Sequence, residues 1–120
     1  MIKIAPSILS ADYASLGSAV DVLADWGADY VHLDVMDGAF VPNITFGAPM
    51  TKALRPHTEL VFDAHLMVEN PSKWVQPFKE AGADIVTIHV EADKHAHRTL
   101  QLIRSLGMKA VSYTHLTLPT

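Results

Sequence analysis

Short apolar runs alternate along the chain with segments in which apolar residues recur every three or four positions. Runs of the first kind, when rich in β-branched residues, are typical of buried strands, and the second spacing is typical of helices with one buried face. The pattern predicts strands over residues 3–8, 30–35, 60–66 and 84–90. It predicts helices over residues 16–26, 49–56 and 71–81, the second of them weak and short, and a last helix that ends before Gly107.

Glycine and proline mark the ends of the predicted helices. Gly27, Gly82 and Gly107 follow apolar stripes as C-terminal caps do, and Asn70-Pro71 is typical of a helix start. Pro77 lies inside the third helix, where it removes an N–H donor, so we expect a kink or a shortened first part. The predicted buried stripes are Leu16, Ala19, Val20, Leu23 and Trp26 in the first helix, Trp74, Val75, Phe78 and Ala81 in the third, and Leu100, Ile103 and Leu106 in the last.

The chain also contains an internal echo. Residues 27–35 match residues 82–90 in pattern, both starting with Gly-Ala-Asp, at an offset of 55 residues. This is the length of about two βα units, so the echo favours a repeating parallel β/α architecture. With right-handed crossovers, such a chain forms either an open doubly wound sheet or a (β/α)8 barrel.

Alternation along the strands separates these two folds, because successive side chains of a strand face opposite sides. Each predicted strand has an apolar face, and near its C-terminal end it carries polar groups on the other face. An open sheet between two helix layers should be apolar on both faces, whereas a barrel with a site at its C-terminal mouth should show this asymmetry. The predicted fold class is therefore α/β, the N-terminal half of a (β/α)8 TIM barrel with about four βα units. The polar positions are Ser7, His32, Asp34, Asp63, His65, Thr87 and His89.

Composition excludes several functions. The 120 residues are 49% hydrophobic with a formal net charge of −4, and no apolar run reaches the ~18 residues of a membrane helix. The N-terminus lacks the pattern of a secretory signal, and the absence of cysteine excludes disulfides and thiolate metal ligands. No basic stripe indicates a nucleic-acid surface. We therefore expect a cytoplasmic protein whose partners are neither membranes nor nucleic acids.

Three of the polar side chains suit a metal ion. His32, Asp34 and His65 would converge from adjacent strands, and two imidazoles with one carboxylate suit zinc, iron, manganese or cobalt. Three protein ligands leave coordination positions open, as in catalytic sites. Packed or hydrogen-bonded histidines are the alternative for each residue taken alone. No Gly-rich phosphate loop and no nucleophile elbow is present.

Other candidates have a plain structural alternative. Ser7 suits a turn or cap as well as a ligand contact, and Met36 and Met67, near the strand ends, suit core packing. His89 would be either a fourth polar wall of the site or an outer neighbour of it. The remaining histidines, His57, His95 and His97, are expected on the solvent-exposed surface.

The candidates Ser7, His32, Asp34, Met36, His65 and Met67 lie in three of five blocks that form a recognisable set. The blocks are 5–12, Ala-Pro-Ser-Ile-Leu-Ser-Ala-Asp; 31–38, Val-His-Leu-Asp-Val-Met-Asp-Gly; 40–43, Phe-Val-Pro-Asn; 46–47, Phe-Gly; and 63–68, Asp-Ala-His-Leu-Met-Val. Together they resemble ribulose-phosphate 3-epimerases, a family of ribulose-phosphate-binding (β/α)8 barrels. The resemblance runs from residue 1 to about residue 110. The second block is highly specific, because it joins two candidate ligands to the loop that follows them.

The resemblance implies one divalent metal ion on His32, Asp34 and His65, with no organic cofactor. It also implies that Asp34 is an acid–base residue, and that the full-length protein is a homo-oligomer. The family's fourth ligand, an aspartate of a later strand that is also the second acid–base group, has no counterpart here. The substrate-contacting positions that it implies are Ser7, His32, Met36, His65 and Met67.

The implied reaction interconverts D-ribulose 5-phosphate and D-xylulose 5-phosphate at C3. A base removes the proton next to the C2 carbonyl, the resulting enediolate is stabilised by the metal as a Lewis acid, and a proton returns to the other face. Methionine walls would exclude water from this chemistry.

The chain departs from the family in length and at its end. A (β/α)8 barrel needs roughly 200 residues or more, and the loops that hold phosphate follow the later strands. We therefore expect this chain to be an inactive fragment on its own. A plausible coding sequence for residues 111–120 coincides with a transposon adapter used in sequencing libraries, so we interpret residues 1–110 as the partial barrel and residues 111–120 as a non-native tail.

Three other functions are candidates for the same residues, and one of them lacks its motif. An epimerase of the same barrel group could act on a ketohexose phosphate such as allulose 6-phosphate, since the reacting centre would be the same. A decarboxylase of the superfamily is disfavoured, because residues 32–37 read His-Leu-Asp-Val-Met-Asp and lack its Asp-x-Lys-x-x-Asp pattern. A non-catalytic, self-associating half-barrel that only binds metal is the third.

Overall fold

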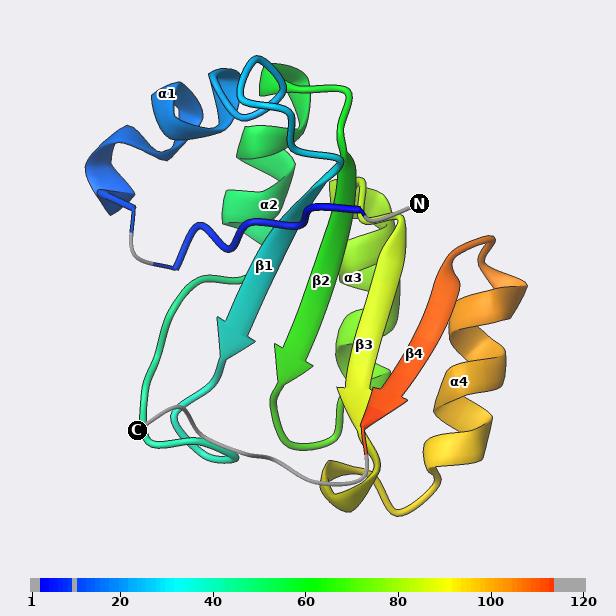
Figure 1. Cartoon of the computed structure of the whole chain (residues 1–120). Helices are drawn as coiled ribbons and strands as arrows, with labels where there is room; N and C mark the ends of the chain where they lie inside the picture. The colour runs from blue at the N-terminus through cyan, green and yellow to red at the C-terminus, as the bar shows by residue number, and fades with distance from the viewer. Residues whose placement is uncertain (1–2, 10, 114–120) are drawn as a thin grey trace.

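A computed structural model describes residues 3–9 and 11–113 of the chain (Figure 1). Strands and helices alternate through most of it. Short 3-10 helices cover Tyr13–Ser15, Arg55–His57 and Val90–Ala92. The regular elements are α1 (Leu16–Asp21), β1 (Tyr30–Met36), α2 (Ala48–Leu54), β2 (Val61–Met67), α3 (Ser72–Ala81), β3 (Ile85–His89), α4 (Ala96–Ser105) and β4 (Lys109–Tyr113).

The four strands form one parallel sheet in the order β1-β2-β3-β4, and Figure 1 shows α2, α3 and α4 together on one side of it. Sequential neighbours joined by helical crossovers are the topology of a β/α barrel wall. The fold is thus α/β and consistent with the N-terminal half of a (β/α)8 barrel, as predicted. None of the helices in the described ranges is long and apolar enough to cross a membrane.

The predicted strand over residues 3–8 is not a regular strand. The segment lies extended beside β1: the Ile4 carbonyl accepts from Tyr30, the Pro6 carbonyl accepts from His32, and the Ile8 N–H donates to the His32 carbonyl. Only one bridge, Ser7 with His32, is complete. A regular ladder would also need an N–H at residue 6 to donate to Tyr30, and Pro6 has none. The proline therefore interrupts the strand but leaves Ser7 aligned with β1.

One helix ends before its predicted end. α1 ends at Asp21 and the chain continues through hydrogen-bonded turns to Gly27, so Trp26 leaves the buried face and is 76% exposed. α4 runs from Ala96 to Ser105 and contains Leu100 and Ile103 of the predicted stripe. α3 continues through Pro77 to Ala81, and Trp74 of its predicted stripe is exposed whereas Val75, Phe78 and Ala81 are buried.

β4 includes the first three residues of the predicted non-native tail. Val111, Ser112 and Tyr113 pair with Thr87, Ile88 and His89 of β3. Residues 114–120 lie outside the described residues. The non-native origin of residues 111–120 stays a prediction, because backbone pairing of this kind does not depend on which side chains the strand carries.

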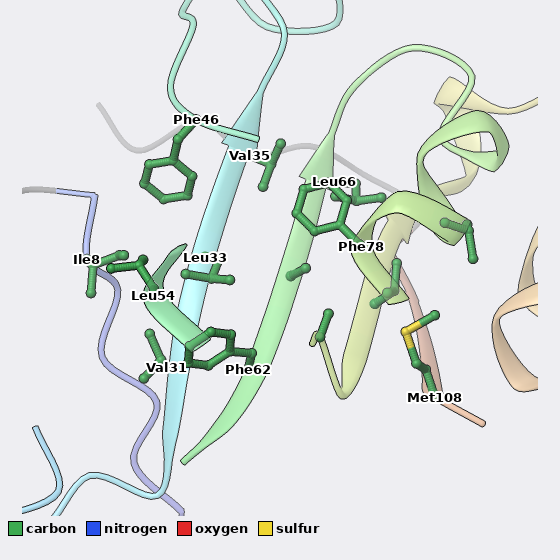
Figure 2. Close-up of a cluster of buried hydrophobic side chains, with 14 of the residues drawn as sticks. Ile8, Val31, Leu33, Val35, Phe46, Leu54, Phe62, Leu66, Phe78 and Met108 are labelled. Carbon is green, nitrogen blue, oxygen red and sulfur yellow. The ribbon is translucent and has the colours of Figure 1, made fainter. Parts of the chain in front are cut away.

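The hydrophobic core fills the space between the sheet and its helices (Figure 2). Alternate residues of β1 and β2 point into it, and their burial patterns alternate accordingly. Phe62 and Phe78 are its largest fully buried side chains, and burying each contributes roughly 1.5–3 kcal/mol. Because the odd-numbered residues of β1 enter the core, His32 and Asp34 must face the side without helices.

Arg55 ties the N-terminal ends of β2 and β3 together. Its guanidinium donates to the Thr58 carbonyl at 2.8 Å, to the Leu60 carbonyl at 2.6 Å and to the Gly82 carbonyl at 3.0 Å. The same group lies 3.8 Å from the ring centroid of Phe62. Nη1 also lies 3.3 Å from Oδ2 of Asp84. The partly buried cation is thus satisfied by carbonyls, a carboxylate and an aromatic face, which offsets its desolvation.

We expect Gly82→Ala to destabilise the chain more than Gly27→Ala. Both glycines have left-handed φ angles, +99° and +86°, so each alanine costs roughly 1–2 kcal/mol in backbone strain. A Cβ at Gly82 would also lie 2.4 Å from Cδ of Arg55, whereas a Cβ at Gly27 would have no atom of residues 3–9 or 11–113 within 4 Å beyond its chain neighbours. Urea unfolding should show a further loss of about 1–3 kcal/mol for Gly82→Ala, from the displaced Arg55 hydrogen bonds. Equal losses would contradict this role of Arg55.

Candidate metal centre

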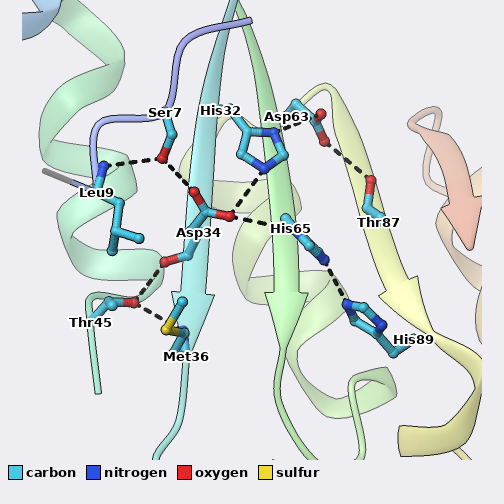
Figure 3. A network of polar contacts seen from close by, with 10 residues as sticks. All are labelled: Ser7, Leu9, His32, Asp34, Met36, Thr45, Asp63, His65, Thr87 and His89. Atoms are coloured by element: carbon cyan, nitrogen blue, oxygen red, sulfur yellow. Dashed lines mark hydrogen bonds and ion pairs between the residues drawn. The ribbon is translucent and has the colours of Figure 1, made fainter. Parts of the chain in front are cut away.

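Adjacent strands bring three of the predicted site residues together. His32 and Asp34 project from β1, and His65 projects from β2 on the same face of the sheet (Figure 3). The parallel register pairs Asp34 directly with His65. One donor atom from each of the three lies within 4.8 Å of the others. Two imidazoles and a carboxylate at these separations fit a divalent transition metal.

Asp34 is the hub of the cluster. One of its oxygens, Oδ1, lies 3.1 Å from Nε2 of His32 and 3.4 Å from Nδ1 of His65. The other, Oδ2, accepts a hydrogen bond from the hydroxyl of Ser7, whose Oγ accepts in turn from the Leu9 N–H at 3.1 Å. The extended N-terminal segment therefore places Ser7 beside the Asp34 carboxylate. The two oxygens of Asp34 contact different partners, the histidines on one side and Ser7 on the other.

These contacts fix the charges. Burial works against ionisation of Asp34, but the hydrogen bonds from His32, His65 and Ser7 outweigh it and hold the pKa of Asp34 well below its usual range. Hydrogen bonds to Asp34 and then to Asp63 raise the pKa of His32 to about 9, against the opposing effect of burial. At neutral pH the metal-free cluster is an ion pair of an aspartate and an imidazolium.

Three neighbours of the cluster were not among the predicted site residues. Asp63 lies 3.1 Å from Nδ1 of His32 and accepts from the Thr87 hydroxyl at 3.3 Å. Thr45 donates to the Asp34 carbonyl at 2.7 Å and accepts from the Met36 N–H at 2.9 Å. Strand alternation already put Asp63 and Thr87 on the polar face, but their partners depend on the register between strands. Thr45 lies in a loop and carried no such signal.

His89 contacts His65 and stays outside the three-residue cluster. It is 2% exposed, and its Nε2 lies 2.7 Å from Nε2 of His65, so one of the two nitrogens carries a proton and the other accepts it. Burial and then the electrostatic influence of the neighbouring His65 lower the pKa of His89. Among the described residues, its Nδ1 has no hydrogen-bond partner, although the Glu91 carboxylate lies 3.5 Å away.

The methionines and the outer histidines lie where the sequence pattern indicated. Met36 and Met67 are the last residues of β1 and β2 and pair with each other across the two strands. Both lie on the strands that carry the cluster, at its C-terminal edge. The three remaining histidines are exposed: His57, which forms a 2.9 Å pair with Asp21, and His95 and His97 beside and within α4.

Fold and site together define a β/α half-barrel with a candidate metal centre at the C-terminal ends of its strands. The model of the Ribulose-phosphate 3 epimerase family matches residues 3–119, and the chain belongs to this family.

Relatives are identical to this chain at about half of the aligned positions. Ribulose-phosphate 3-epimerase of Bacillus subtilis is 54% identical over 110 residues, which cover 92% of this chain and 51% of the relative. The enzyme of that name from Rhodobacter capsulatus is 54% identical over 109 residues, 91% of this chain and 48% of the relative. The chloroplastic ribulose-5-phosphate-3-epimerase of Arabidopsis thaliana is 51% identical over 111 residues, which cover 91% of this chain and 40% of the relative. The chain spans about half the length of the curated relatives it matches.

We expect the metal-free chain to lose stability as pH rises from about 6.5 to about 9. The folded-state pKa of His32 lies above its ordinary value, so its contribution is complete below pH of about 6.5 and disappears as pH passes about 9. The loss should reach up to about 3 kcal/mol. Urea unfolding in the presence of a chelator measures it. A His32→Gln variant should lack this pH dependence, and parallel curves for the two proteins would contradict the assignment.

Proposed function

We propose that the protein to which this chain belongs interconverts D-ribulose 5-phosphate and D-xylulose 5-phosphate by moving the proton at C3. The observation that carries the proposal is the Asp34 carboxylate, held ionised between two histidines and a serine on the open face of the sheet. Membership of the Ribulose-phosphate 3 epimerase family supports it. A carboxylate of this kind can take a proton from a carbon next to a carbonyl if the developing negative charge is stabilised.

The two oxygens of Asp34 suit two tasks. Oδ1 faces the histidines, and Oδ2 faces Ser7. When the Ser7 hydroxyl turns to a substrate oxygen, Oδ2 becomes free to accept the C3 proton. The backbone on either side of Ser7 is bonded to His32, so this change needs a rotation of the Ser7 side chain and breaks no backbone bond.

The cluster also suits one divalent metal ion, with His32, Asp34 and His65 as its protein ligands. When bound, such an ion supplies a Lewis acid that stabilises negative charge on the substrate oxygens. The chain's own residues have two further roles. The histidines orient Asp34, and Met36 and Met67 border the site without offering a proton. Low polarity on that side strengthens the electrostatic interactions inside.

The second acid–base group and the phosphate-binding loops belong, on this proposal, to the half of the family fold that these 120 residues do not contain. Proton return to the opposite face of C3 needs a second group, because Asp34 reaches one face only. The 120-residue chain alone should therefore bind metal yet fail to turn over substrate.

We expect the chain to bind one divalent ion, tested with Zn²⁺ or Co²⁺ in competition with a chromophoric chelator. His65→Gln and Asp34→Asn each remove a ligand atom and should weaken binding by more than the 10–100-fold typical of changes around a ligand. His97→Gln is the matched control, because His97 is exposed on α4. Equal affinity for His65→Gln and His97→Gln would refute the assigned site.

We expect epimerase activity only from a protein that supplies the second half of the barrel. A coupled assay should show turnover of D-ribulose 5-phosphate by the complete gene product and about a thousandfold loss on Asp34→Asn, within the 10²–10⁴ range of acid–base groups. The 120-residue chain should give none. Faster turnover of allulose 6-phosphate would replace the pentose assignment with a hexose one, and activity of the isolated chain would overturn the two-halves interpretation.

A further inference from the structure

His32 is held at both of its ring nitrogens by carboxylates. Nε2 lies 3.1 Å from Oδ1 of Asp34, inside the candidate metal cluster, and Nδ1 lies 3.1 Å from Oδ2 of Asp63. The two nitrogens of an imidazole point away from each other, so Asp63 cannot share an ion with Asp34 and His65. Asp63 lies outside the cluster and contacts only the outer edge of the ring (Figure 3).

Asp63 is itself held in place. Its second oxygen, Oδ1, accepts from the hydroxyl of Thr87 at 3.3 Å, and Thr87 is 3% exposed on β3. The parallel register of β1 and β2 pairs Asp63 directly with His32. Both oxygens of this carboxylate are therefore occupied by groups whose positions the sheet fixes, and the carboxylate can accept from His32 in one orientation of the ring.

The orientation matters because a neutral imidazole carries one proton. A ring that keeps its proton on Nε2 has no lone pair to offer a metal at that atom, and a flipped ring points the wrong nitrogen at Asp34. An acceptor at Nδ1 keeps the proton there and makes the other nitrogen a better ligand.

We propose that Asp63 is a positioning residue of the metal site: it accepts the Nδ1–H of His32 and so presents Nε2 to the ion beside Asp34 and His65, while Thr87 orients Asp63. The proposal rests on the proposed function in so far as that function supplies the metal. It adds a chain of contacts, Thr87 to Asp63 to His32, that runs from β3 through β2 to β1.

Two measurements test the proposal. The first is the Zn²⁺ affinity of the chain, and the second is the NMR signal of the His32 Nδ1–H proton in a ¹⁵N-histidine-labelled chain. Asp63→Ala should weaken Zn²⁺ binding about 10–100-fold and abolish the protected Nδ1–H signal. Asp63→Asn keeps an acceptor oxygen of the same shape, so it should lose less than about tenfold. Thr87→Val should lose about threefold, as expected for one lost hydrogen bond.

Asp21→Asn is the matched control. It removes the same charge from another aspartate–histidine pair, that of Asp21 with His57 at 2.9 Å, which lies outside the cluster. Its Zn²⁺ affinity should equal that of the unmodified chain. The visible spectrum of bound Co²⁺ adds a readout that a merely structural role would leave unchanged: it should shift in Asp63→Ala and stay the same in Asp21→Asn.

The outcomes separate the two proposals. If circular dichroism shows folded Asp63→Asn and Asp63→Ala chains that bind Zn²⁺ within about twofold of the unmodified chain, the positioning role is wrong. If Asp63→Ala does not fold, the Zn²⁺ affinities of Asp63→Asn and Thr87→Val test the positioning role instead. Losses of less than about tenfold and of about threefold support it, and unchanged affinities in both overturn it. If the unmodified chain binds no metal, the metal site of the proposed function fails. The Nδ1–H signal of the metal-free chain then still decides whether Asp63 holds His32: its persistence without the Asp63 carboxylate overturns the role.

Discussion

The parallel register between β1 and β2 sets Asp34 beside His65 and His32 beside Asp63. Side chains alternate along a strand, so a slip of one residue would turn either set into the core and put leucine and alanine on the open face. The core enforces the register: Leu33 pairs with Ala64, and both are fully buried. Hydrophobic burial behind the sheet therefore determines which polar groups meet in front of it.

Polar groups on the open face are deeply covered towards the middle of the sheet. Every residue of β3 is buried, including Thr87 and His89, whereas β4 is exposed along most of its length. Burying polar side chains is costly unless they find partners. Thr87 finds Asp63, and His89 finds His65. The contacts that shape the cluster thus also compensate for the burial of β3.

Strand alternation predicted the polar face, and with it His32, Asp34 and His65, because alternation is a local property of each strand. Strand alternation could not predict that Asp63 contacts His32 or that Thr87 contacts Asp63, because these contacts depend on how three strands align. Pro6 does carry a local signal, because a proline cannot donate to a ladder, and the predicted first strand is interrupted there. Helical spacing predicts Trp26 and Trp74 to be buried, yet both are exposed. Spacing alone does not show that α1 ends at Asp21, before Trp26, or how far the elements packed against α3 extend towards Trp74.

Arg55 and the cluster around Asp34 lie towards opposite ends of one sheet. Arg55 binds carbonyls where β2 and β3 begin, and the charged cluster forms towards the end where β1 and β2 finish. Cohesion where the strands begin and the geometry of the charged cluster therefore depend on different side chains of one sheet.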